Sequence, residues 1–160
     1  MTILLSNMPV FGGVDNKLLQ YLLDHCPRKR LSQGEYFFRE DENAKAMYVL
    51  QYGQVRVEKR WRDRTIAMRT LGEGDCFGEM ALIDLYPRSA SVVALEDSEA
   101  LEIEPSLLAS IYEHDQQAFT IIYMNMAREI SRRLRDTDRR YFESSMMNKT
   151  GDYEANIQFV

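Results

Sequence analysis

The apolar residues of the chain follow two different periods. Leucines recur at helical spacing after Asp15, which can cap a helix that ends before Pro27. From residue 35 onward the apolar residues form short stretches rich in β-formers, separated by turn sequences such as Tyr52-Gly53. We expect strands near residues 36–38, 47–50, 55–59, 66–71, 91–95 and 100–103. This pattern predicts a sandwich or jelly roll behind a small helix.

Helical spacing returns after residue 104. Pro105 favours the first position of a helix, with Leu107, Leu108 and Ile111 on its apolar face. A longer helix is predicted from about residue 115 to residue 141, where apolar residues recur every three or four positions at Phe119, Ile122, Met126, Ile130 and Leu134. This stripe is compatible with a dimer seam and equally with packing back on the strands. Residues 144–160 are polar and aperiodic, which predicts a flexible tail.

Composition fits one soluble domain. The chain has 160 residues, of which 45% are hydrophobic and 28% are charged. No stretch approaches the roughly 18 uncharged apolar residues of a membrane span, and the N-terminus does not read as a signal peptide. We therefore expect a cytoplasmic protein that does not contact a membrane. A net charge of −5 argues against direct nucleic-acid contact by this chain.

Cysteine and histidine content argues against metal chemistry. Cys26 and Cys76 lie far apart and are expected to be reduced core thiols, and His25 and His114 are not at ligand spacing. No nucleophile with its base and no Walker loop is recognisable. The chain is therefore predicted to be a binding protein without metal or cofactor, and not an enzyme.

The stretch "FGEMALIDLYPRSASV", residues 77–92, fits neither a core strand nor a surface loop. Gly78 would let a ligand approach the backbone, and the following apolar run suits one helical turn whose first N–H groups face an anion. Arg88 can grip the same anion, while Glu79 can accept hydrogen bonds from hydroxyls beside it. These groups together describe a site for a nucleotide sugar-phosphate. The alternative is a surface helix with an Arg–Glu ion pair.

The same stretch resembles the phosphate-binding cassette of the cyclic nucleotide-binding domain family, whose pattern is F-G-E, two or three small or apolar residues, a variable link and P-R-S/T-A. "GEYFFRE", "MYVLQYGQVRV" and "LGEGDCFGE" are similar to that family's strand-turn pattern. The resemblance covers roughly residues 10–134, in the layout of catabolite activators and protein kinase A regulatory subunits.

The resemblance implies a mainly β fold, an eight-stranded double-stranded β-helix or jelly roll, followed by a long C-terminal helix. Residues 1–30 would form an N-terminal helical segment, residues 31–104 the β-roll with the cassette at 77–92, and residues 105–143 the C-terminal helices. Asp41 stands where many members have glycine, and Asp tolerates the left-handed conformation comparatively well.

The resemblance also implies roles for residues. Arg88 would pair with the cyclic phosphate of a 3′,5′-cyclic nucleotide, and Glu79 would accept the ribose 2′-OH. Further contacts would come from the cassette residues Gly78, Met80, Ala81, Ser89 and Ala90, chiefly through backbone N–H groups. Met68 would form a wall for the base, or else be a core methionine.

Arg133, beside Arg132, could stack on the purine, or else belong to a solvated helix face with Glu129. Ser89 is compatible with cAMP and with cGMP, and we favour cAMP.

The expected activity is binding and signalling. The ligand would shift the helices after Pro105 and so regulate a protein partner or an attached output domain. A homodimer through residues 115–141 is one prediction. Too few residues follow Tyr141 for a DNA-binding domain, so the chain could also be a fragment of a catabolite-activator-type regulator. A degenerate β-roll that serves as an interaction module without ligand is a further alternative.

Overall fold

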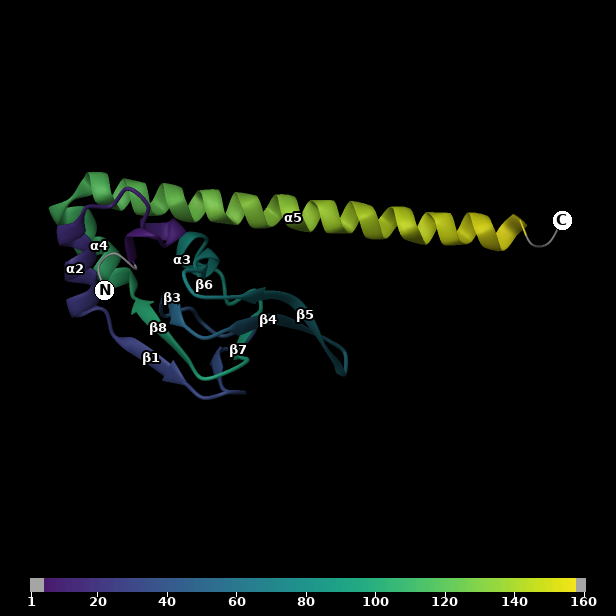
Figure 1. The fold of residues 1–160 in the computed structure, drawn as a ribbon, viewed down its shortest axis with the longest axis horizontal. Coiled ribbons are helices and arrows are strands. Elements are labelled where there is room, and N and C mark those ends of the chain that lie inside the picture. The colour runs from purple at the N-terminus through teal and green to yellow at the C-terminus, as the bar shows by residue number, and fades with distance from the viewer. Residues whose placement is uncertain (1–4, 158–160) are drawn as a thin grey trace. The chain divides into compact units, whose positions relative to one another are not determined.

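The computed structural model describes the backbone of residues 5–157 and the side chains of residues 5–147. The chain divides into two compact units, of which the first ends at Met126 and the second begins at Ala127. The elements run in the order η1 (Pro9–Phe11), α2 (Asn16–His25), β1 (Arg28–Leu31), β2 (Tyr36–Phe38), β3 (Met47–Tyr52), β4 (Val55–Trp61), β5 (Arg64–Leu71), β6 (Cys76–Phe77), α3 (Met80–Ile83), β7 (Ser91–Ala94), β8 (Ser98–Ile103), α4 (Pro105–His114) and α5 (Gln116–Ile157) (Figure 1).

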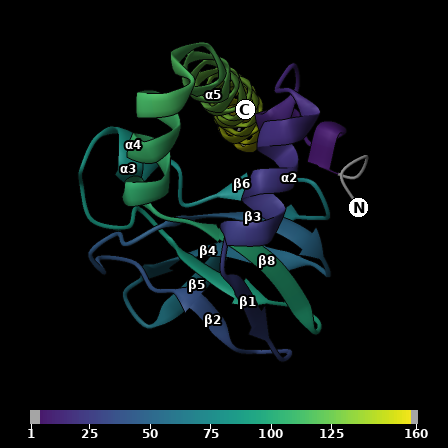
Figure 2. The same cartoon turned by 90° about the vertical axis from the view of Figure 1, so that its left-hand side faces the viewer.

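The eight strands form two antiparallel sheets, which confirms the predicted β-roll. One sheet has the order β1-β8-β3-β6 and the other β2-β7-β4-β5 (Figure 2). Side chains from both sheets meet in an inner cluster that includes Phe37, Tyr48, Leu50, Val55 and Phe77. Because consecutive residues of a strand point to opposite faces, alternate residues of β3 such as Tyr48 and Leu50 enter this interior, while Val49 faces a second cluster.

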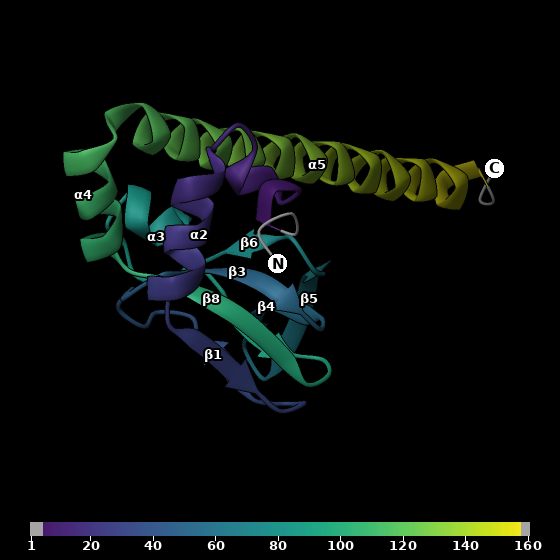
Figure 3. The ribbon, with the colours of Figure 1, turned by 60° about the vertical axis from the view of Figure 1, so that its left-hand side comes forward.

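A second apolar cluster joins the helices of the first unit to the sheet that contains β1, β8, β3 and β6. Asp15 caps α2 by accepting a hydrogen bond from the N–H of Leu18 at 2.8 Å, as predicted. Figure 3 shows α2 and α4 together at one end of the roll. Ile122 and Met126, from the start of α5, are fully buried in this cluster. The first half of the predicted stripe therefore packs on its own unit.

The two thiols behave as expected. Cys26 and Cys76 are both buried and form no disulfide, and burial raises the pKa of Cys26 to about 12. None of the helices in the described part of the chain has the length and apolar content to cross a membrane.

Two strands were missed by the sequence prediction. β1 begins at Arg28, so the boundary expected at residue 31 falls within a strand. Its sequence is Arg-Lys-Arg-Leu, and its long cationic side chains conceal the alternation; Arg28 and Arg30 both bind Glu99 on β8. β6 has only two residues, too few to show a period.

The structure extends α5 into the predicted tail, and whether that segment is flexible stays a prediction. α5 continues to Ile157, whereas residues 144–160 were expected to be flexible; residues 158–160 lie outside the described part. A helix satisfies its backbone hydrogen bonds internally, and this segment contains no proline. Lack of apolar periodicity therefore did not exclude helix.

Candidate functional site

The predicted turn of helix after Gly78 is present. Gly78 follows β6 with a φ of +78°, a left-handed conformation that favours glycine, and α3 begins two residues later. Glu79 stands at the start of α3 and is buried, with an exposed fraction of 3%. The strand, the glycine and the short helix thus place a carboxylate inside the protein and not on its surface.

Arg88 lies against Gly78. Its exposed fraction is 3%, and its Nη1 donates to the carbonyl oxygen of Gly78 at 2.8 Å. Nη2 donates to the carbonyl oxygen of Ala46, and Cζ lies 3.9 Å from the centre of the Phe38 ring. The guanidinium is therefore held between an aromatic face and two backbone carbonyls, in contrast to a solvated surface ion pair.

The backbone around Arg88 is fixed by the turn after β2. The N–H of Arg88 donates to the carbonyl oxygen of Glu42 at 2.9 Å, and the N–H of Asp41 donates to the carbonyl oxygen of Arg88 at 2.9 Å. Asp41 has a φ of +69°, so the expected left-handed position is confirmed. This double bridge aims the Arg88 side chain inward.

Electrostatics make the Arg88 position unusual. Burial lowers the pKa of Arg88, while the charges of Tyr48, Glu42 and Glu79 act in the opposite direction. An arginine side chain remains protonated in proteins, so a positive charge is buried here. Its Nε has no hydrogen-bond partner within the described residues. A buried cation with an unused donor is costly unless an anion completes its shell.

The other predicted cassette residues surround this pair in the sequence but differ in exposure. Ala81 is buried and Ala90 is half-buried, whereas Met80 and Ser89 are exposed. The structure therefore brings the Arg88 guanidinium to Gly78 and near Glu79. Which backbone N–H groups contact a ligand stays a prediction.

Met68 and Arg133 come from two different elements, β5 and α5. Met68, on β5, has an exposed fraction of 45%, so the core-methionine alternative is wrong. Arg133 lies in the second unit, where its Nε donates to Glu129 at 2.9 Å. Arg132 binds the same carboxylate at 2.9 Å, as the helix-face alternative predicts. A role for either residue toward the base stays a prediction.

Sequence reasoning missed two contacts of Arg88. The Phe38 ring and the carbonyl of Ala46 come from segments more than 40 positions away. The aromatic pair Phe37-Phe38 was recognised as a strand, but nothing in it indicates which ring faces the arginine. Only the fold of the two sheets determines that contact.

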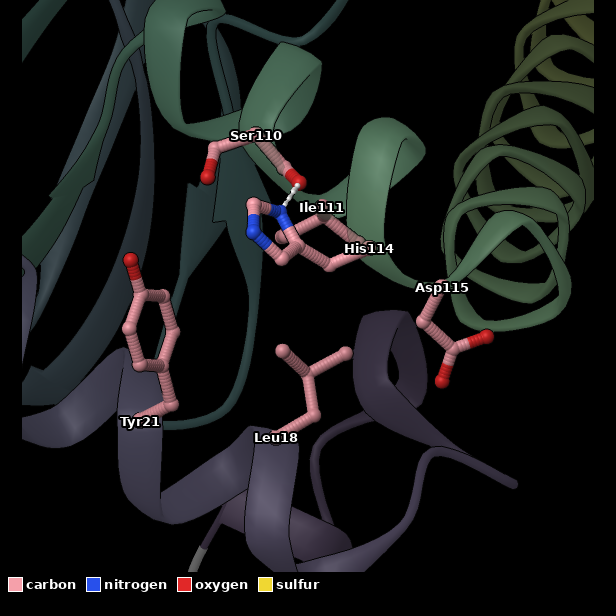
Figure 4. Close-up of a pocket in the computed structure, with 6 residues that line it drawn as sticks. All are labelled: Leu18, Tyr21, Ser110, Ile111, His114 and Asp115. Carbon is pink, nitrogen blue, oxygen red and sulfur yellow. Dashed lines mark hydrogen bonds between the residues drawn. The ribbon is translucent and has the colours of Figure 1, made fainter.

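A hollow of about 190 Å³ between α2 and α4 is a separate feature (Figure 4). It is lined by Leu18, Tyr21, Ile111, His114 and neighbouring residues. Nδ1 of His114 is hydrogen-bonded to the carbonyl oxygen of Ser110 at 2.8 Å. This lining is mainly apolar and contains no buried cation, so it does not match the predicted anion site. Among the described residues no group of three or more metal-ligating side chains occurs.

The two antiparallel sheets, with Glu79 and Arg88 buried in the segment between β6 and β7, define a β-roll domain. The family model for the cyclic nucleotide-binding domain matches residues 28–115, which is more than half of the chain. The chain belongs to the cyclic nucleotide-binding domain family.

Known relatives agree with this membership. The chain is 33% identical over 138 residues to the cyclic AMP receptor protein of Thermus thermophilus, covering 84% of this chain and 61% of that protein. It is 30% identical over 111 residues to a cGMP-dependent protein kinase of Plasmodium berghei, covering 69% of this chain and 12% of the kinase.

Among solved structures, the Thermus thermophilus catabolite activator protein matches with a TM-score of 0.74 and 29% identity, over 86% of this chain and 63% of that one. The chain thus spans about three-fifths of the length of these bacterial relatives.

Proposed function

We propose that the chain is a receptor domain for a 3′,5′-cyclic nucleotide, with cAMP preferred over cGMP. The observation that carries the proposal is the buried guanidinium of Arg88, whose Nε has no hydrogen-bond partner among the described residues. Glu79 is also buried, and its charge acts on Arg88. A cyclic phosphodiester carries one negative charge and would neutralise this cation. Glu79 would accept the ribose 2′-OH, so a ligand without that hydroxyl would leave a buried carboxylate without its partner.

Ligand binding has to compete with the contacts that Arg88 already makes. The guanidinium donates to the carbonyl oxygens of Gly78 and Ala46, and a phosphate would draw at least one of these donors away. Backbone N–H groups of Gly78, Ala81, Ser89 and Ala90, in the same cassette as Met80, would complete the phosphate and sugar contacts. Met68 and Arg133 are proposed for the base.

The preference for cAMP is the finer part of the proposal. The Thermus relative is named a cyclic AMP receptor protein, and a more distant relative is named a cGMP-dependent kinase. The alignment with the cyclic AMP receptor protein covers 84% of this chain and the alignment with the kinase covers 69%, and this greater coverage supports cAMP. Ser89 is compatible with either purine, so the cassette alone does not decide.

We further propose that the domain signals through its C-terminal helices. α4 and the start of α5 contribute Leu108, Ile111, Ile122 and Met126 to the core of the first unit, so a change in this packing would reach α5 directly. The ligand would shift their equilibrium by preferring one arrangement. α5 would carry the signal to a protein partner, to an output domain or to a second copy of the chain.

Calorimetric titration with cAMP, cGMP and 5′-AMP tests the proposal. We expect saturable binding of cAMP with a dissociation constant near micromolar, about −8 kcal/mol, weaker binding of cGMP, and much weaker binding of the acyclic nucleotide. Absence of binding by both cyclic nucleotides would favour the degenerate β-roll. Tighter binding of cGMP would overturn the proposed preference while leaving the receptor function intact.

A further inference from the structure

The β4–β5 hairpin is a basic segment in an acidic chain. Residues 59–69 contain five basic residues and one acidic residue, a local charge of +4, whereas the whole chain carries −5. The basic residues are Lys59, Arg60, Arg62, Arg64 and Arg69, and the acidic one is Asp63. At physiological ionic strength charges are screened beyond about 8 Å, so a partner at the hairpin meets mainly this local charge.

The hairpin extends beyond the sheet that carries it. β7 pairs with β4 only from Val55 to Glu58, whereas β4 and β5 stay paired as far as Trp61 and Arg64. The outer part of the hairpin is thus a two-stranded ribbon, which projects from the roll in Figure 1. Every residue from 59 to 68 is exposed, and Trp61 has an exposed fraction of 64%.

Three arginines of the ribbon form no side-chain ion pair with the acidic groups that the structure describes, although Glu40 is near Arg60 and accepts from its backbone N–H. Lys59 binds Glu40 at 3.2 Å, and at the base of the hairpin Arg56 binds Glu58 at 2.9 Å. Within the described residues, Arg60, Arg62 and Arg64 form no ion pair. Three positive charges are therefore available to a partner.

Trp61 adds an apolar element among these charges. Cζ of Arg62 lies 5.7 Å from the centre of the Trp61 ring, and Arg62 has a left-handed φ of +53°. Glycine adopts that conformation at lower cost, so the turn geometry alone does not call for an arginine. The tip presents a large aromatic surface next to a cation, a combination enriched at protein interfaces.

The base of the hairpin adds a hollow and a free edge. A hollow of about 230 Å³ lies beside it, and its lining includes Arg39, Lys59 and Arg60 but also Glu40, Asp41 and Glu58, so an acidic segment is expected along the strand edge and not in this hollow. β5 is the outermost strand of its sheet, so an extended segment can align along it.

We propose that the β4–β5 hairpin docks an extended acidic segment of a partner protein. Carboxylates of the segment pair with Arg60, Arg62 and Arg64, and an apolar side chain packs on Trp61. A second copy of this chain fits less well, because it would place the same cations opposite each other. A long nucleic acid would run past the hairpin onto the rest of the protein, which carries the excess of acidic residues.

The protein contains its own reporter, because Trp61 is the only tryptophan in the chain. Nucleotide-free protein is titrated with a glutamate-rich peptide of about eight residues with one central leucine, which spans about 26 Å when extended. We expect a saturable change in Trp61 emission and weaker binding at higher salt. Arg64→Glu should weaken binding at least about fivefold, and the matched charge reversal Lys17→Glu on α2 should leave it unchanged.

Each contrary result identifies a different error. Equal effects of Arg64→Glu and Lys17→Glu would show that net charge and not the hairpin attracts the peptide. Tighter binding of a single-stranded oligonucleotide than of the peptide would assign the surface to nucleic acid. A concentration-dependent change in sedimentation without peptide, abolished by Arg64→Glu, would assign it to a second copy. An unchanged emission over the whole titration would end the proposal. Retained cyclic nucleotide binding in Arg64→Glu shows that the variant is folded.

Discussion

Replacing Arg88 by alanine removes the group on which the proposed site depends. In the ligand-free protein the change deletes the hydrogen bonds to the carbonyl oxygens of Gly78 and Ala46, and each buried carbonyl left without a partner costs about 1–3 kcal/mol. It also removes the contact with the Phe38 ring and the attraction between the guanidinium and the buried Glu79. Removing a buried positive charge is itself favourable, and this gain offsets part of the lost stability. We therefore expect a lower but measurable melting temperature.

The effect on ligand binding should be larger than the effect on stability. Truncating one member of a buried charge pair costs about 2–5 kcal/mol, so the dissociation constant for cAMP should rise about 30-fold to about 5,000-fold. Arg88→Lys keeps the charge but loses the planar fork, so its affinity should fall between those of the parent and Arg88→Ala. Calorimetric titration measures both variants.

A matched control separates the site from general charge effects. Arg30 binds Glu99 on the surface, and its side chain is 75% exposed. Arg30→Ala should therefore bind cAMP like the parent. The reasoning is refuted if Arg88→Ala remains folded by circular dichroism and still binds cAMP within about threefold of the parent, which is less than about 0.7 kcal/mol.

Three further changes test other parts of the structure. Glu79→Gln should reduce the preference for cAMP over 2′-deoxy-cAMP in paired titrations, because an amide accepts the ribose hydroxyl less strongly; unchanged discrimination would remove Glu79 from the site. Gly78→Ala would place a Cβ 2.5 Å from Nη1 of Arg88 at a φ of +78°, so we expect lower stability by at least about 1 kcal/mol and weaker cAMP binding. A parent-like Gly78→Ala variant would contradict the position of the guanidinium. Asp15→Ala should lower the free energy of unfolding by about 1 kcal/mol through loss of the α2 cap, without altering cAMP affinity, whereas Asn16→Ala should have little effect on either.

The fold was largely predictable because most of its core strands are short runs of apolar and β-branched or aromatic residues. A short aromatic run such as Tyr36–Phe38 in β2 predicts a buried strand, and the turn residues around it mark where the strand ends. β1 escaped because its inward positions are Lys29 and Leu31, while Arg28 and Arg30 are exposed and bind Glu99. Lys29 donates to the carbonyl oxygen of Phe37, and a charged residue at an inward position conceals the alternation. Helix in residues 144–157 escaped because the backbone hydrogen bonds of a helix form without any apolar period in its side chains.

The site was predictable only in part, for a similar reason. Residues of the cassette are close in sequence, so one motif reveals Gly78, Glu79 and Arg88 together. The guanidinium points inward because of the turn at Asp41 and the carbonyl oxygen of Ala46. Ala46 comes from the segment just before β3, far from Arg88 in the sequence. Local sequence carries no information about such pairings between distant strands.

The most direct test of the central claim is a crystal structure of the protein grown with cAMP. We expect phosphate oxygens within about 2.7–2.9 Å of the Arg88 guanidinium, the ribose 2′-OH on Glu79, and at least one of the Arg88 bonds to Gly78 and Ala46 exchanged for the phosphate. A structure with the nucleotide bound elsewhere, and with Arg88 still on both carbonyl oxygens, would contradict the account.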